Sequence, residues 1–153
     1  MNAAPGNVHQ IILGNLVVAL TNEQRRRGAQ WRAIPGIGAL VSNTSRPEPD
    51  VMILPRQPDD PTARDTTDAL VLFEILSPST ANRDLKWKRA AYTKLARLTH
   101  YVVVAQDAVD VVVFARDAGF AERRLTRLED AITFPDLGIS LSLSDIYYDL
   151  DFA

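Results

Sequence analysis

Residues 69–76 form the apolar run that most constrains how this chain can fold. Apolar side chains occupy both alternating sets of positions, which is typical of a strand buried on both faces and so of a sheet covered on each side. Glu74 is the single polar residue of the run. Because burying an unpaired carboxylate is strongly unfavourable, Glu74 should have a metal ion or a cation beside it.

A second carboxylate opens another apolar run. Asp50 follows Pro49 and precedes residues 51–54, whose sequence is Val-Met-Ile-Leu. The alternate prolines Pro47 and Pro49 favour an extended backbone, so the chain enters this strand already extended. Two carboxylates at the ends of two hydrophobic strands, with a lysine further along, are the minimum set for a metal-assisted phosphodiester hydrolase.

Composition limits the classes of protein. The 153 residues are 46% hydrophobic and 24% charged, as in ordinary globular chains, and we expect one domain over residues 1–153. The chain has no cysteine, which excludes a disulfide framework and fits a reducing compartment. With only two histidines as well, a structural zinc site is not expected. The sequence has no signal-peptide pattern and no long apolar segment, so we expect a soluble, cytoplasmic protein without a membrane span. The net charge of -2 lacks the strongly basic character of most nucleic-acid-binding domains. Any DNA contact must therefore come from local basic patches or from metal-bridged phosphates.

Periodicity and turn residues predict an α/β fold. An apolar helical repeat predicts a helix over residues 8–26 that stops near Gly28, and Asp84 is a suitable N-cap for a helix over residues 84–98. Ser144 can cap a short final helix over residues 145–150. Loops are expected at 56–68 and 134–138, and strands at 36–44, 50–54, 69–76, 101–105, 109–115 and 120–127.

A set of motifs gives the chain a resemblance to a known family. The set comprises Pro49-Asp50-Val51, Glu74-Ile75-Leu76-Ser77-Pro78-Ser79-Thr80, Asp84, Lys88 and Tyr92. Their order and spacing resemble those of the Uma2 family, described as restriction endonucleases within the PD-(D/E)XK nuclease superfamily. The resemblance covers residues 9–143. It implies a divalent-metal-dependent DNA endonuclease with a restriction-endonuclease-like core, in which a mixed central sheet is flanked by helices and carries a β-hairpin extension.

The resemblance also implies which residues form the site. Asp50 and Glu74, on neighbouring strands, would hold Mg²⁺ or Mn²⁺ together with the backbone carbonyl of Ile75. Hard divalent cations prefer such oxygen ligands and keep several waters, one of which can become the nucleophile. The superfamily places a lysine two positions after the second acid, where this chain has Leu76. Uma2-like chains supply that lysine from the following helix.

Lys88 is the lysine that we expect to act at this site. Asp84, Lys88 and Tyr92 are spaced by four residues, so they share one face of the predicted helix. Lys88 lies near the start of that helix and could reach the end of the Glu74 strand. Its ammonium would stabilise charge on the phosphate or orient the attacking water. Lys86 lies on another side of the helix and is the alternative lysine for this role. Asp84, Tyr92 and Lys86 are the candidate supporting residues of the site.

Plainer interpretations of the same residues stay open. Asp84 and Lys88 alone would make a weak surface ion pair, and Asp50 alone would be a turn residue after proline. Glu74 could instead be a buried carboxylate paired with Lys88 or Arg89.

Four further residues are interpreted without a catalytic role. His9 fits a helix start, although the family often has a histidine near this point. We expect packing rather than base stacking to explain Trp31 and Trp87. His100 stands just before the strand predicted from residue 101, where Uma2-like chains usually have a glutamate. This difference puts in doubt any role of that part of the molecule in assembly or substrate contact.

Three function classes follow from these observations. The first is the metal-dependent DNA endonuclease, for which we expect a homodimer because nucleases that cut both strands commonly pair two sites. The second is a catalytically inactive binding or assembly module with the nuclease fold, favoured by the net acidity and by a start close to the first helix. The third is a hydrolase of small phosphate esters.

Overall fold

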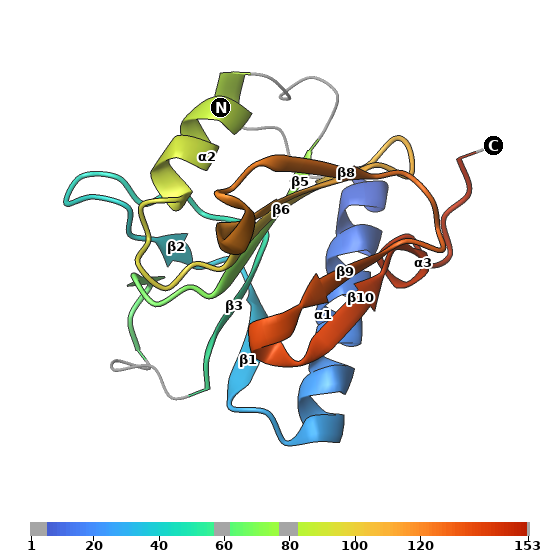
Figure 1. Ribbon diagram of the computed structural model, residues 1–153, viewed down its shortest axis with the longest axis horizontal. Coiled ribbons are helices and arrows are strands. Elements are labelled where there is room, and N and C mark those ends of the chain that lie inside the picture. The colour runs from blue at the N-terminus through green and yellow to red at the C-terminus, as the bar shows by residue number, and fades with distance from the viewer. Residues whose placement is uncertain (1–5, 57–61, 77–82, 153) are drawn as a thin grey trace.

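The structure, a computed structural model, describes residues 6–56, 62–76 and 83–152 (Figure 1), except the side chains of residues 83 and 84. The helices are α1 (Asn7–Arg27), α2 (Arg83–Tyr92) and α3 (Leu143–Ile146), with 3-10 turns η1 (Arg116–Ala118) and η2 (Pro135–Leu137). The strands are β1 (Trp31–Pro35), β2 (Gly38–Ala39), β3 (Val51–Pro55), β4 (Asp65–Thr66), β5 (Val71–Leu76), β6 (His100–Ala105), β7 (Val111–Ala115), β8 (Glu122–Leu125), β9 (Ala131–Phe134) and β10 (Ile139–Ser142). In the part of the chain that these ranges cover, no helix is long and apolar enough to cross a bilayer.

A six-stranded mixed sheet forms the centre of the molecule. Its strand order is β1-β3-β5-β6-β7-β8, with β5 and β6 parallel and the other neighbours antiparallel. The parallel pair requires a crossover connection, and α2 lies in it, as in other βαβ units. This mixed α/β architecture confirms the fold class that the sequence predicts.

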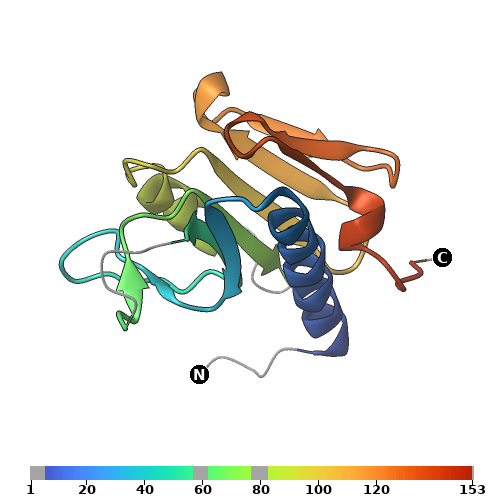
Figure 2. The ribbon, with the colours of Figure 1, turned by 90° about the horizontal axis from the view of Figure 1, so that it is seen from below.

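Apolar cores cover both faces of the sheet. On one face α1, the β9–β10 hairpin and α3 pack against Val71, Phe73 and Ile75 of β5. On the other face Leu72 packs with Tyr92 at the end of α2. Figures 1 and 2 show α1 and the hairpin apart from α2, with the sheet between them. The two-sided burial predicted for residues 69–76 is therefore confirmed.

The helix predicted over residues 8–26 is α1, which buries Ile12, Leu16 and Leu20 against the sheet. It ends at Gly28, whose φ of 58° lies in the left-handed region that favours glycine. The Gly28 N–H donates to the Arg25 carbonyl at 3.3 Å. The predicted helix stop at Gly28 is confirmed.

The strand predicted over residues 36–44 is wrong. The edge strand is β1, which pairs along its whole length with β3, from Trp31 opposite Pro55 to Pro35 opposite Val51. Only Gly38–Ala39 of the predicted range forms a strand, in a small parallel pair with β4. β1 carries the exposed Arg32 and ends in proline, so its sequence lacks the regular apolar alternation by which strands are recognised.

The C-terminal hairpin of β9 and β10 was not predicted. Its strands pair from Ile139 opposite Phe134 to Ser142 opposite Ala131, and η2 joins them in place of the expected loop. Each strand contains four residues, which is too short for a clear alternation.

Two predicted helices have different bounds in the structure. α2 ends at Tyr92 instead of continuing to residue 98, and Asp84 lies within it instead of preceding it. The final helix begins at Leu143, and its cap is Ser142 instead of Ser144. The Ser142 hydroxyl accepts the Asp145 N–H at 3.1 Å.

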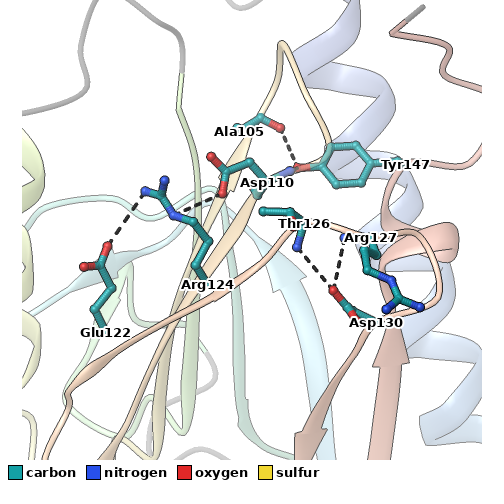
Figure 3. Close-up of polar contacts among 8 residues, drawn as sticks. All are labelled: Ala105, Asp110, Glu122, Arg124, Thr126, Arg127, Asp130 and Tyr147. Atoms are coloured by element: carbon teal, nitrogen blue, oxygen red, sulfur yellow. Dashed lines mark hydrogen bonds and ion pairs between the residues drawn. The ribbon is translucent and has the colours of Figure 1, made fainter.

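Tyr147 fastens the end of α3 to the main sheet (Figure 3). Its hydroxyl donates to the Ala105 carbonyl at 2.9 Å and accepts the Asp110 N–H at 3.2 Å. Burial raises the pKa of Tyr147 to about 12, so the phenol stays neutral.

Figure 3 also shows the turn that leads into β9. The Asp130 carboxylate accepts the Arg127 N–H at 3.0 Å, which holds this turn.

Candidate metal centre

The pairing of β3 with β5 brings the two predicted carboxylates together. Val51 stands opposite Phe73, so Asp50, just before β3, lies beside the next residue of β5, Glu74. The Asp50 N–H donates to the Phe73 carbonyl at 3.1 Å, and its Oδ2 accepts the Ile75 N–H at 2.7 Å. The Asp50 side chain is thereby held against the backbone of β5 at the position of Glu74.

Glu74 is buried, with 4% of its surface exposed. Its Oε1 accepts the Tyr92 hydroxyl at 2.8 Å and lies 3.3 Å from Nζ of Lys88. Burial raises the pKa of Glu74 to about 7 and the charge of Asp50 adds to this, while Lys88 and the Tyr92 hydroxyl act in the opposite direction. The carboxyl group therefore changes its charge near neutral pH.

Helix α2 supplies two groups that contact Glu74. Lys88 and Tyr92 lie one turn apart on the same face, as their spacing predicts. Lys86 is exposed, and no contact joins it to Glu74 within the described residues. The side chain of Asp84 lies outside what the structure describes.

Arg89 is not the partner of Glu74. Its guanidinium donates to the Phe120 carbonyl at 2.6 Å and lies 4.4 Å from the centre of the Phe114 ring. Of the two cations proposed from the sequence as partners of Glu74, the structure brings Lys88 to it.

His9 joins the site from the first turn of α1. Its Nε2 lies 3.1 Å from Oδ1 of Asp50, and 14% of its side chain is exposed. From the sequence alone His9 is expected only to be a helix-start residue, because no spacing rule connects a residue in a helix with one that precedes a distant strand. The only signal was the histidine that the family often has near this point.

The donor set suits a hard divalent cation. Asp50 and Glu74 offer carboxylate oxygens, and each oxygen that already accepts a hydrogen bond keeps a further lone pair. The Asp50 side chain is 22% exposed, so water reaches the site. Across the described residues, no three His, Asp or Glu side chains converge as metal ligands. Mg²⁺ commonly accepts a small number of protein carboxylates and keeps several water ligands.

Other residues considered from the sequence lie elsewhere. Trp31 is 5% exposed and packs in the core as predicted, but Trp87 is 50% exposed, so the packing expectation is wrong for it. His100 packs edge-on against Phe134 with ring centres 4.8 Å apart, and burial lowers its pKa.

Comparisons with known proteins agree with this architecture. A crystal structure of "a putative nuclease belonging to DUF820" from Anabaena variabilis superposes with a TM-score of 0.76 and 14% sequence identity, covering 95% of this chain and 83% of that one. This likeness shows a shared fold. No curated protein matches the chain. The model of the Uma2 family, described as "Putative restriction endonuclease", matches residues 1–144. Since that match spans nearly the whole chain, the protein belongs to the Uma2 family.

Proposed function

We propose that the protein is a divalent-metal-dependent DNA endonuclease of the PD-(D/E)XK type that acts in the cytoplasm. The observation that carries this proposal is the meeting of Asp50, Glu74 and Lys88 at one end of β3 and β5, with Lys88 Nζ 3.3 Å from Glu74 Oε1. Membership of a family described as restriction endonucleases supports the same reaction class.

Each residue of the site has a proposed task. Asp50, Glu74 and the Ile75 carbonyl would hold Mg²⁺ or Mn²⁺, which when bound polarises the phosphate and lowers the pKa of a water. Lys88, supplied from α2, would stabilise negative charge on the phosphate in place of the lysine that the superfamily carries on the strand. Tyr92 holds Glu74 in place through its hydroxyl.

Cleavage of supercoiled plasmid tests the proposal. Nicking should require Mg²⁺ or Mn²⁺, and it should fall by about 100-fold or more in Asp50→Asn, Glu74→Gln and Lys88→Ala. Lys86→Ala is the matched control, because Lys86 lies on the same helix and is exposed. Circular dichroism checks that each variant folds. Cleavage that persists in both carboxylate variants would exclude Asp50 and Glu74 as the catalytic centre.

A second candidate is an inactive nuclease-fold module that binds or assembles with other molecules. The observation that favours it is that Glu74 already has Lys88 and the Tyr92 hydroxyl beside it, so a metal is not required to compensate its burial. Mn²⁺ titration by calorimetry separates the two: the inactive module binds no metal and cleaves no nucleic acid. Cleavage of a chromogenic diester with DNA left intact would instead indicate a small phosphate ester as substrate.

We further propose that the enzyme works as a homodimer, since nucleases that cut both strands of a duplex commonly pair two sites. Light scattering coupled to gel filtration measures the mass directly. A monomer that still cuts both strands would exclude this arrangement.

A further inference from the structure

A second polar site lies at the opposite end of α1. A hollow of about 620 Å³ opens between the end of α1, the edge strand β1 and the residue that follows β3. Arginines from all three segments line it, namely Arg25, Arg32 and Arg56. The described residues that line the hollow include no acidic side chain.

This hollow is separate from the candidate metal centre. His9, at the metal centre, and Arg25, at the hollow, lie 16 positions apart in one helix, which corresponds to about 24 Å at the helical rise. Asp50 precedes β3, whereas Arg56 follows its end. The two sites therefore occupy opposite ends of both elements.

Within the described residues, the three arginines differ from their neighbours in lacking an acidic partner. Arg26 and Arg27 both bind the carboxylate of Glu23, at 2.7 Å and 3.0 Å. No ion pair or side-chain hydrogen bond within the described residues involves the guanidinium groups that line the hollow. Three cations that share a solvent space, with no counter-charge among the described lining residues, create a local positive potential on a chain whose net charge is -2.

Backbone contacts fix where these arginines stand. The Arg56 N–H donates to the Gln30 carbonyl at 2.7 Å, which ties the end of β3 to the start of β1. Arg32 lies on β1 opposite Leu54, next to the buried Trp31. The Gly28 turn joins α1 to this strand. The three side chains therefore project from elements whose relative positions are set by sheet pairing and core packing.

We propose that this arginine hollow binds phosphate groups. A guanidinium presents a planar set of donors that matches phosphate oxygens in pairs, and several guanidiniums around one space can share a ligand with more than one phosphate. The volume lies in the range of sites that hold small molecules. The phosphates could belong to a small phosphorylated compound or to the backbone of a nucleic acid, and the chemistry of recognition is the same.

Calorimetric titration with inorganic pyrophosphate tests the site. The buffer contains EDTA, so that no metal at Asp50 and Glu74 contributes, and the outcome does not depend on nuclease activity. Arg25→Gln and Arg32→Gln should each weaken binding by about tenfold. Arg26→Gln is the matched control, because it removes an exposed arginine from the same end of α1. Unlike the arginines of the hollow, Arg26 already pairs with Glu23.

A labelled single-stranded oligonucleotide, titrated at several salt concentrations, shows whether the bound phosphates belong to a small phosphorylated compound or to a nucleic acid. Loss of pyrophosphate affinity in Arg32→Gln with unchanged oligonucleotide binding supports a small phosphorylated ligand. Weaker oligonucleotide binding with a shallower salt dependence in the same variant supports a nucleic-acid backbone, whether or not pyrophosphate binds. If neither probe loses affinity, or if Arg26→Gln loses as much as Arg32→Gln, the proposal is overturned.

Discussion

At the scale of single residues, Glu74 combines opposing electrostatic effects in one carboxyl group. Burial and the neighbouring Asp50 disfavour its charged form, whereas Lys88 and the Tyr92 hydroxyl favour it. The balance leaves the pKa of Glu74 at about 7, well above the ordinary value of 4.5. A cation bound beside Asp50 and Glu74 would shift this balance towards the charged form, which is the form that can ligate a metal.

The stability of the metal-free protein should depend on pH through Glu74. Since the folded state binds this proton more tightly than the unfolded state, the free energy of unfolding should fall by about 3 kcal/mol as the pH rises from 4.5 through about 7. Urea unfolding over this window in EDTA measures the effect. Glu74→Gln cannot titrate, so it should lack this part of the decline. A variant with the same slope as the wild type would assign the pH dependence to other groups.

His9 should tune the metal centre through Asp50. Removing a residue that holds a metal ligand commonly weakens metal binding by 10-fold or more, so His9→Ala should lower the Mn²⁺ affinity by about that factor. His9→Gln can still donate to Asp50 and should recover part of the loss. Calorimetric Mn²⁺ titration of the three proteins provides the comparison. Equal affinities would limit His9 to a structural role at the start of α1.

At the scale of elements, α3 and the residue after it hold the C-terminal part of the chain to the sheet. Tyr147 is 3% exposed and joins the β6–β7 hairpin through Ala105 and Asp110. The β9–β10 hairpin packs in the same core as α1. The hydrogen bonds of one phenol therefore connect the end of α3 to the last residue of β6 and to the residue before β7.

Tyr147→Phe should destabilise the fold by about 1–2 kcal/mol, because the part-buried Ala105 carbonyl and Asp110 N–H lose the hydroxyl to which they bond. Tyr148 is 70% exposed, so Tyr148→Phe serves as the control and should change the free energy of unfolding by less than about 0.5 kcal/mol. Chemical denaturation of both variants measures the difference. Equal effects of the two substitutions would contradict a special role of the Tyr147 hydroxyl.

At the scale of the whole molecule, one core joins the N-terminal and C-terminal parts of the chain. Leu16 of α1, Phe73 of β5 and Ile139 of β10 belong to the same buried cluster. The single domain over residues 1–153 remains a prediction, and this shared core is the reason to expect one cooperative unfolding transition.

Leu16→Ala should therefore weaken the entire domain. The loss of a fully buried side chain should cost about 2–5 kcal/mol and lower the midpoints of tryptophan fluorescence and far-ultraviolet circular dichroism together. Val18 lies on the same helix but is 59% exposed, so Val18→Ala should have an effect below about 0.5 kcal/mol. Two separate transitions would show that the chain unfolds in independent parts.

Local sequence patterns were sufficient to predict a helix or strand where the burial of its side chains follows a regular period. The helical repeat around Leu16 and the apolar run around Glu74 predicted α1 and β5. The four-residue spacing of Lys88 and Tyr92 predicted their shared face. Patterns failed for β1, where a polar and a proline position interrupt the alternation, and for the short strands β9 and β10.

The sequence by itself determined that Glu74 is buried and requires a compensating group, because a carboxylate inside an apolar strand allows few alternatives. Only the tertiary structure decided which groups meet it. The register of β3 against β5 brings Asp50 alongside, and the packing of α1 brings His9 to Asp50. Periodicity reports the environment of each segment, whereas contacts between distant segments depend on pairing and packing that no local pattern encodes.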